Sequence, residues 1–206
     1  MSDNFTGATT SHCLPLRPGA KHVYIEGNTQ ERVTLDVRSV GPNEVSLDVK
    51  LPNGMNAAFQ IRSDRPPNSN LDTSRLWITK ADTGSGIALT FGPGGLALPM
   101  NLVVGETITA QPNEQNPATG GQMVITFHVD AVEKVKVRPQ LALDQEAGFL
   151  VHQVVKSTVV VKDTNLGTVL ARFELWLLPG LGLVKSAGQA FGVFTILDLI
   201  EFHTPA

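Results

Sequence analysis

The sequence predicts an all-β fold: a single domain built on a strongly curved antiparallel sheet or half-open β-barrel, with very little helix. Short runs in which apolar and polar residues alternate recur along the chain, which is typical of half-buried strands. Turn sequences rich in Gly, Pro and Asn separate these runs. An aromatic-rich run at 173–178 meets Pro179-Gly180, and a second apolar run follows at 183–185, so two strands joined at a forced bend are expected.

Composition favours one globular domain. The chain has 206 residues, of which 42% are hydrophobic and 17% are charged, which is too apolar for disorder and too often interrupted for a membrane-spanning helix. The net charge is −3, and Lys and Arg are scattered rather than clustered. Because a phosphate backbone needs a concentrated basic surface, nucleic acid is excluded as an expected partner.

The first residues differ in composition from the rest. Residues 1–13 are rich in Ser, Thr and Asn and are expected to form a flexible N-terminal arm, followed by the β domain at 14–206. Cys13 is the only cysteine, so no intrachain disulfide is possible. Residues 1–10 lack the apolar core of an export signal. We expect a periplasmic or extracellular protein whose signal is absent from this sequence, or a cytoplasmic one if Met1 is the native start.

The first half of the domain contains the clearest alternation. Val33, Leu35 and Val37 alternate with polar residues, and the pattern resumes after a Gly-Pro-Asn turn, which predicts a hairpin. Asn53-Gly54 is expected to form the next tight turn. The expected strands are 22–26, 33–38, 45–50, one around 58–61, 75–80 and 87–91. The glycine-rich stretch 92–95 cannot lie inside a sheet, so two similar halves are expected to meet near 92–98.

The second half repeats this organisation. Strands are expected at 107–110, 123–129, 149–161, 169–177 and 191–202, with a polar loop at 111–121 and a helical turn at 141–147. The last strand is apolar on both faces. It is therefore expected to be central in the sheet or covered by another element.

Three motifs in this order resemble a known family. Residues 16–24 fit "Leu-x-x-Gly-x-x-Trp-x-Tyr" with His22 in the aromatic position, and residues 98–108 fit "Leu-Pro-x-x-Leu-x-x-Gly-Glu-Thr-Trp" with Ile108 in place of Trp. Residues 176–185 match "Trp-Tyr-x-x-Gly-x-Gly-Leu-Val-Lys" with Leu177 in place of Tyr. This set resembles the DUF3108 and TapB-like family of bacterial extracytoplasmic β proteins. The resemblance implies a curved sheet akin to the lipoprotein carriers LolA and LolB, and it transfers no catalytic residue.

The aromatic and glycine landmarks are the candidate site residues. Alternation places aliphatic neighbours of Trp77 and Trp176 on the opposite face of their strands, so the indoles either pack in a covered core or line a concave apolar cradle. Core packing is the favoured interpretation. Two glycines one residue apart would let a backbone or a ring approach closely. The candidate set, as an apolar cradle or a structural motif, is Trp77, Trp176, Pro179, Gly180, Gly182 and Phe194.

Catalytic and metal sites find little support. Asp82-Thr83-Gly84-Ser85 spells the aspartic-protease signature, but there is one copy, and these residue types are also those of a polar turn. His128 and His152 lie in expected strands without a second ligand two positions away, and His12 beside Cys13 offers only two ligands. We therefore expect no catalytic residue, no metal and no cofactor.

The expected function is a non-enzymatic binding module for an apolar or lipid-like molecule, or a cell-envelope accessory protein. An alternative is a structural subunit that self-associates through edge strands and the N-terminal arm, as a homo-oligomer or with a cell-envelope partner. An aspartic-protease-like enzyme through Asp82 ranks third.

Overall fold

A computed structural model describes residues 8–14, 16–51, 54, 56–66, 74–82, 88–92, 94–116, 118–137, 150–190 and 193–203. Nearly all of its regular structure is β-strand, with one helix, α1 (Thr10–Cys13). The strands are β1 (Ala8–Thr9), β2 (Lys21–Glu26), β3 (Arg32–Gly41), β4 (Glu44–Lys50), β5 (Asn56–Ser63), β6 (Leu76–Asp82), β7 (Ala88–Thr90), β8 (Leu96–Ala97), β9 (Asn101–Leu102), β10 (Thr107–Ala110), β11 (Met123–Val137), β12 (Leu150–Asp163), β13 (Val169–Leu178), β14 (Gly182–Ala190) and β15 (Val193–His203).

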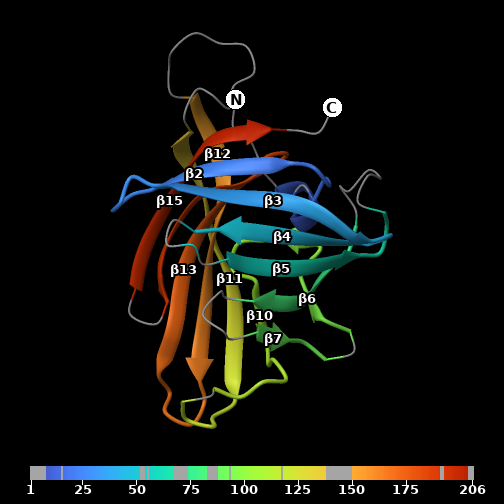
Figure 1. The fold of residues 1–206 in the computed structure, drawn as a ribbon, viewed down its shortest axis with the longest axis vertical. Coiled ribbons are helices and arrows are strands. Elements are labelled where there is room, and N and C mark those ends of the chain that lie inside the picture. The colour runs from blue at the N-terminus through green and yellow to red at the C-terminus, as the bar shows by residue number, and fades with distance from the viewer. Residues whose placement is uncertain are drawn as a thin grey trace.

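One large antiparallel sheet organises the chain. Its order is β10-β11-β12-β13-β14-β15-β2-β3-β4-β5-β6-β7, with β8 paired to β6, and a separate small sheet pairs β1 with β9. The long strands β11–β13 run along the long axis of the molecule, whereas β2–β5 cross it, so the sheet curls strongly on itself (Figure 1). The edge strands β10 and β7 do not pair with each other, and the curled sheet is therefore not closed. The predicted all-β, curved antiparallel fold is confirmed.

The strand that is apolar on both faces lies inside this sheet. β15 pairs with β14 over its first half and with β2 over its second half, from Leu197↔Glu26 to His203↔Lys21. Of the two positions expected from the sequence, central in the sheet or covered by another element, the structure shows the central one. This pairing joins β15, the last described strand, to β2, the first strand of the large sheet in chain order.

The element after the Pro179-Gly180 bend is longer than the sequence indicated. β14 continues to Ala190, whereas only the short run Leu183-Val184-Lys185, with two apolar residues, marked it as a strand. Its remaining residues include small ones such as Ala187 and Gly188, which have little intrinsic strand preference. Pairing with β13 and β15 on both sides therefore sets its length.

The N-terminal segment differs from the expected flexible arm over the part that is described. Residues 8–13 form β1 and α1 and are largely buried, with Cys13 fully so. Their polar groups find distant partners: Thr10 N–H donates to the Met100 carbonyl at 3.0 Å, and the Thr10 hydroxyl donates to the Pro99 carbonyl. Residues 1–7 lie outside the described part, as does the expected helical turn at 141–147.

The free edges of the sheet are bridged by loop residues. Asn113 N–H donates to the Thr90 carbonyl at 2.9 Å, and Thr90 N–H and hydroxyl both donate to the Glu114 carboxylate at 2.6 Å. The polar loop that follows β10 thus covers the end of β7. Both edge strands are short, and β10 covers only Ile125–His128 of the longer strand β11.

Candidate functional site

The sheet from β11 to β14 has one apolar and one charged face. Register places Phe127 opposite Val159, Val159 opposite Phe173, and Phe173 opposite Gly188, so these side chains share a face. The next row on that face contains Val129, Ser157, Leu175 and Ser186. The opposite face carries charged side chains, among them Asp130, Lys156, Glu174 and Lys185.

The apolar face points into the curl of the sheet. The edge cluster of buried side chains comprises Ala81, Leu89, Phe91 and Met123, and Phe59, Ile78 and Ile125 are packed against it. Phe91 directly follows β7, and the other side chains come from β5–β7 at one end of the sheet order and from β11 near the other end. Because strands so distant in the sheet touch through these side chains, their apolar faces must face each other.

Many large side chains of this inward face are only half-buried. In β11–β15 they are Phe127, Val159, Phe173, Leu175 and Leu197, and in β3–β5 they are Leu35, Leu47, Val49 and Phe59. Their neighbours on the same face, such as Val129 and Val155, are fully buried. An apolar side chain in a completely filled core would be shielded from solvent, as those neighbours are. We refer to the nine half-buried residues as the apolar lining.

The same face also contains hydroxyl groups. Ser157 is fully buried between Val129 and Leu175, and its Oγ has no hydrogen-bond partner among the described residues. Ser186, opposite Leu175 on the next strand, is also buried. An unpaired buried hydroxyl is unfavourable, so this part of the face is not optimised for packing alone.

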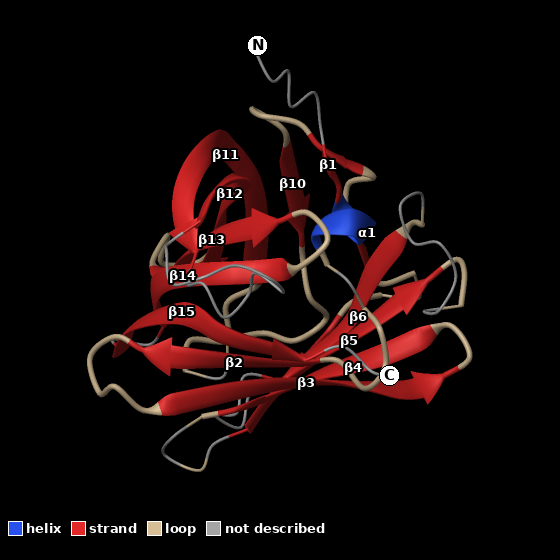
Figure 2. Cartoon of the chain, turned by 90° about the horizontal axis from the view of Figure 1, so that it is seen from above, coloured by secondary structure: helices blue, strands red, loops and turns tan. Residues whose placement is uncertain are grey.

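The N-terminal segment closes one end of the inward face. Ala8 and Cys13 belong to a buried cluster with Leu102, Val129, Val155 and Leu177, here named the N-terminal cluster. Leu14 packs both against this cluster and against the cluster formed by β3–β6, which includes Val37, Val45 and Ile61. Seen along the long axis, α1 lies between β10 and β6 (Figure 2). Burial raises the pKa of the Cys13 thiol to about 12, so Cys13 is an unreactive thiol in this conformation.

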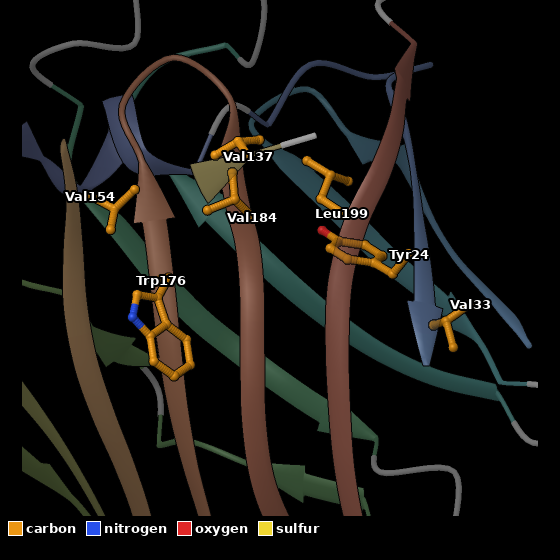
Figure 3. Packing of buried hydrophobic residues seen from close by; sticks show 7 residues of the cluster. All are labelled: Tyr24, Val33, Val137, Val154, Trp176, Val184 and Leu199. Carbon is orange, nitrogen blue, oxygen red and sulfur yellow. The ribbon is translucent and has the colours of Figure 1, made fainter. Parts of the chain in front are cut away.

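Trp176 lies on the other face of β13, away from the apolar lining of its own strand. It is 8% exposed and belongs to the tyrosine cluster, with Tyr24, Val33, Val137, Val154, Val184 and Leu199 (Figure 3). Lys156 and Lys185, its paired neighbours on β12 and β14, place their ammonium groups 5.1 and 5.2 Å from its ring. Its indole N–H donates to the Glu133 carboxylate. Trp176 is therefore a packed side chain held by charged neighbours.

The Pro179–Gly182 stretch forms a tight turn that contacts two other parts of the chain. Gly180 and Gly182 have φ angles of 82° and 101°, which only glycine adopts readily. Gly180 N–H donates to the His12 carbonyl at 2.8 Å, and His22 Nε2–H donates to the Leu181 carbonyl at 3.1 Å. The turn therefore links α1 to β2.

The remaining candidate residues lie apart from Trp176. Trp77 is half-buried on β6, with the Arg62 guanidinium 5.3 Å from its ring. Phe194 is 53% exposed near the start of β15. Over the described residues, Trp77, Trp176 and Phe194 belong to no common cluster and do not line one cradle.

The other sequence motifs do not assemble into a reactive site. Asp82 ends β6, and residues 83–85 of the protease-like motif lie outside the described part. His128 is paired with Thr158 and bonds Thr107 at 2.7 Å, whereas His152 is paired with Val135 further along the same hairpin. No three His, Cys, Asp or Glu side chains among the described residues are grouped as a metal site.

A hollow of about 350 Å³ lies beside β3 and β4, lined by Gly19, Ala20, Asp36, Val37, Arg38, Asp48 and Lys50. Its charges are already paired across the strands: Lys50 Nζ lies 3.1 Å from Asp36, and Arg38 pairs with Asp48. Exposed ion pairs of this kind contribute little to stability. Because their charges neutralise each other, the hollow has no excess charge that would attract an anion or a cation.

Comparison with known protein families finds no match, and neither does comparison with curated proteins. Three solved structures are similar. A candidate lipoprotein from Parabacteroides distasonis has 12% identity over 95% of this chain and 99% of its own, with a TM-score of 0.44. A β-barrel-like protein of the domain of unknown function DUF1849 from Brucella abortus has 10% identity over 90% and 98%, with a TM-score of 0.45. A candidate exported protein with a YmcC-like fold from Bacteroides fragilis has 10% identity over 93% and 98%, with a TM-score of 0.38.

With TM-scores under 0.5, these likenesses support no inference about ligand or activity. Their descriptions name lipoprotein, exported and β-barrel-like proteins, and none names DUF3108, so that resemblance rests on the three sequence motifs. Within the described part of the chain, no helix has the length and apolar character needed to cross a bilayer.

The sequence pointed to the tryptophans, whereas the structure puts the half-buried apolar surface elsewhere. Phe127, Phe173 and Leu175 lie in expected strands, but nothing local distinguishes them from core residues. They can be assigned to one surface only when the cross-strand register and the inward-facing side of each strand are known.

Proposed function

We propose that this chain is a non-enzymatic binding module that holds an apolar or lipid-like molecule against the apolar lining, as an accessory protein of the cell envelope. The observation that carries the proposal is the half-buried state of nine large apolar side chains on the inward face of the curled sheet. Six of them pack against the buried clusters of the described residues, whereas Val159, Phe173 and Leu175 belong to none. Concave, mostly apolar surfaces with a few hydroxyls are typical of small-molecule sites. The apolar character of the lining selects a hydrocarbon chain over a charged metabolite.

The self-association alternative has less support. Residues 8–14, which would have to pair with another copy, are already packed within their own chain. The edge strands β7 and β10 have three and four residues, and loop residues bridge the end of β7. The part of β11 from Ala131 to Val137 pairs only with β12, so it is the one longer edge among the described residues at which a strand could add.

A fluorescent fatty acid tests the proposal. The delipidated protein is titrated with cis-parinaric acid, and saturable binding that oleic acid displaces is expected. Leu175→Trp should abolish binding while leaving the unfolding midpoint nearly unchanged, because the larger ring enters the space that the ligand would occupy. The matched control is Leu166→Trp, at a side chain 66% exposed on the β12–β13 turn, which should bind as the parent does.

Two outcomes would overturn the proposal. One is the absence of saturable binding of either fatty acid to the parent protein. The other is a strong loss of stability in Leu175→Trp, which would mean that side chains already fill the face and leave no room.

A further inference from the structure

We propose that residues 8–14 form a gate over one end of the apolar lining, and that this gate must open for a ligand to enter or leave. The inference rests on the proposed function and concerns the regulation of the same site. "Gate segment" below means residues 8–14, which comprise β1, α1 and Leu14.

The gate segment covers the inward face from both sides of the curl. Cys13 contacts the N-terminal cluster, whose members Val129 and Val155 lie on the same face as the lining residues Phe127 and Leu175. Leu14 reaches both that cluster and the β3–β6 cluster. The segment therefore spans the two halves of the sheet where its edge strands do not pair.

The gate segment has few hydrogen bonds to the rest of the chain. β1 pairs with β9 through two residues, outside the large sheet, and α1 has only four residues. Beyond these, Thr10 bonds the Pro99 and Met100 carbonyls, and the His12 carbonyl accepts from Gly180 N–H. A segment with so few hydrogen bonds can detach by local opening, at a lower free energy than unfolding of the sheet. On the side of β13 and β14, the Pro179–Gly182 turn holds the gate segment through the hydrogen bond from Gly180 N–H to the His12 carbonyl.

A reversible disulfide can hold the gate shut. Thr9 and Asn101 are directly opposite on β1 and β9, and because Thr10 bonds Met100, they form the non-hydrogen-bonded pair of the ladder. Cα atoms of such pairs lie about 4.5 Å apart, within the range that a disulfide spans. The test variant is Thr9→Cys with Asn101→Cys in a Cys13→Ser background, and the Cys13→Ser parent is the matched control.

The readout is the rate at which cis-parinaric acid loads and leaves, measured under oxidising and reducing conditions. In the oxidised variant we expect both rates to fall by about tenfold or more, with recovery on reduction, because the bridge prevents local opening. The parent should show equal rates in both conditions. Equal rates in the oxidised and reduced variant would overturn the gate and leave the binding function standing. An absence of binding in every form would overturn the proposed function.

A second measurement needs no ligand. Cys13 of the unaltered chain belongs to the gate segment and is fully buried against Val129, Val155 and Leu177, so its rate of modification by a maleimide reports detachment of the segment. Thr10→Val removes the hydroxyl that bonds Pro99 while keeping the side-chain shape, and it should speed modification about fivefold with little change in the urea midpoint. Modification that occurs only as fast as global unfolding, in both proteins, would overturn the gate.

Discussion

The Tyr24 hydroxyl donates a hydrogen bond to the Leu183 carbonyl, 3.0 Å away, across strands that are not neighbours in the sheet. β15 separates β2 from β14, but its pairing with β14 begins only at Lys185↔Asp198. On that side, Leu183 lies beyond the ladder. Tyr24 thus ties β2 to β14 at a point that the β14–β15 ladder does not reach.

Tyr24→Phe should lower the free energy of unfolding by roughly 2 kcal/mol, because the ring still fills its site while the Leu183 carbonyl loses its partner. Urea unfolding followed by circular dichroism measures this change. Ser39→Ala, which removes an exposed hydroxyl bonded to the Gly41 carbonyl, is the control and should change stability by less than about 0.5 kcal/mol. Equal midpoints for Tyr24→Phe and the parent would contradict the role given to this bond.

Trp176→Ala should cost about 3 kcal/mol, since it removes a buried ring from the tyrosine cluster. Trp77→Ala, at a half-buried indole in another strand, should cost less. Denaturant midpoints of the two variants give the comparison. If the midpoint of Trp176→Ala stays at the parent value while fatty-acid binding is lost, Trp176 belongs to a functional surface and our assignment of a packing role is wrong.

Gly188→Ala should cost about 1–3 kcal/mol by overpacking. An added Cβ would lie 2.5 Å from Phe173 Cδ1 and would also collide with the Arg172 carbonyl, a backbone atom that cannot move aside easily. The control is Gly92→Ala, where the added Cβ would meet nothing within 4 Å. Thermal unfolding of the pair is the measurement, and similar midpoints would refute the close approach of Phe173 to β14.

Acid should weaken the fold partly through Asp163. This buried carboxylate accepts from the Thr119 hydroxyl, from Asn116 Nδ2 at 2.8 Å and from the backbone N–H groups of Asn165 and Leu166. The Thr119 hydrogen bond is the largest cause that lowers the pKa of Asp163, and burial partly opposes it. The unfolded state then binds the proton more tightly. This stabilisation is therefore fully present above about pH 4 and is lost as pH falls through the folded-state pKa.

Asp163→Asn should lower stability at neutral pH and reduce the drop between pH 7 and pH 3, as measured by urea midpoints at the two pH values. Glu31→Gln, at an exposed side chain, should leave both midpoints close to those of the parent. An unchanged acid limb in Asp163→Asn would show that other carboxylates account for acid sensitivity, among them Glu26, Asp48 and Glu114, whose pKa values are also lowered.

The fold class was predictable because alternation and turn chemistry are local properties. The β3–β4 hairpin follows from the alternation of Val33, Leu35 and Val37 with polar residues. That β15 is central or covered follows from apolar residues on both of its faces. The residues of β14 after Lys185 show no such alternation, and Ala187 and Gly188 are extended because they pair with a neighbouring strand.

The site was less predictable because it depends on contacts between distant residues. Thr10 and Ser11 have the composition of a loop, yet both are buried, and Thr10 is held by hydrogen bonds to the carbonyls of Pro99 and Met100. The sequence neighbours of Trp176 are apolar, and only the strand register shows that Lys156 and Lys185 flank its ring. Long-range pairing, rather than local composition, decides both cases.

The pairing of β2 with β15 imposes an order on how the molecule is made. In the middle of the sheet, β15 lies between β14 and β2, which are far apart in the sequence. The strands on either side can form hairpins early, but the two halves of the sheet cannot join until β15 has been synthesised. Closing so long a loop is entropically costly and slow. During that interval β2 and β14 each present an unpaired edge, so a ribosome stalled before β15 would expose two aggregation-prone half-sheets.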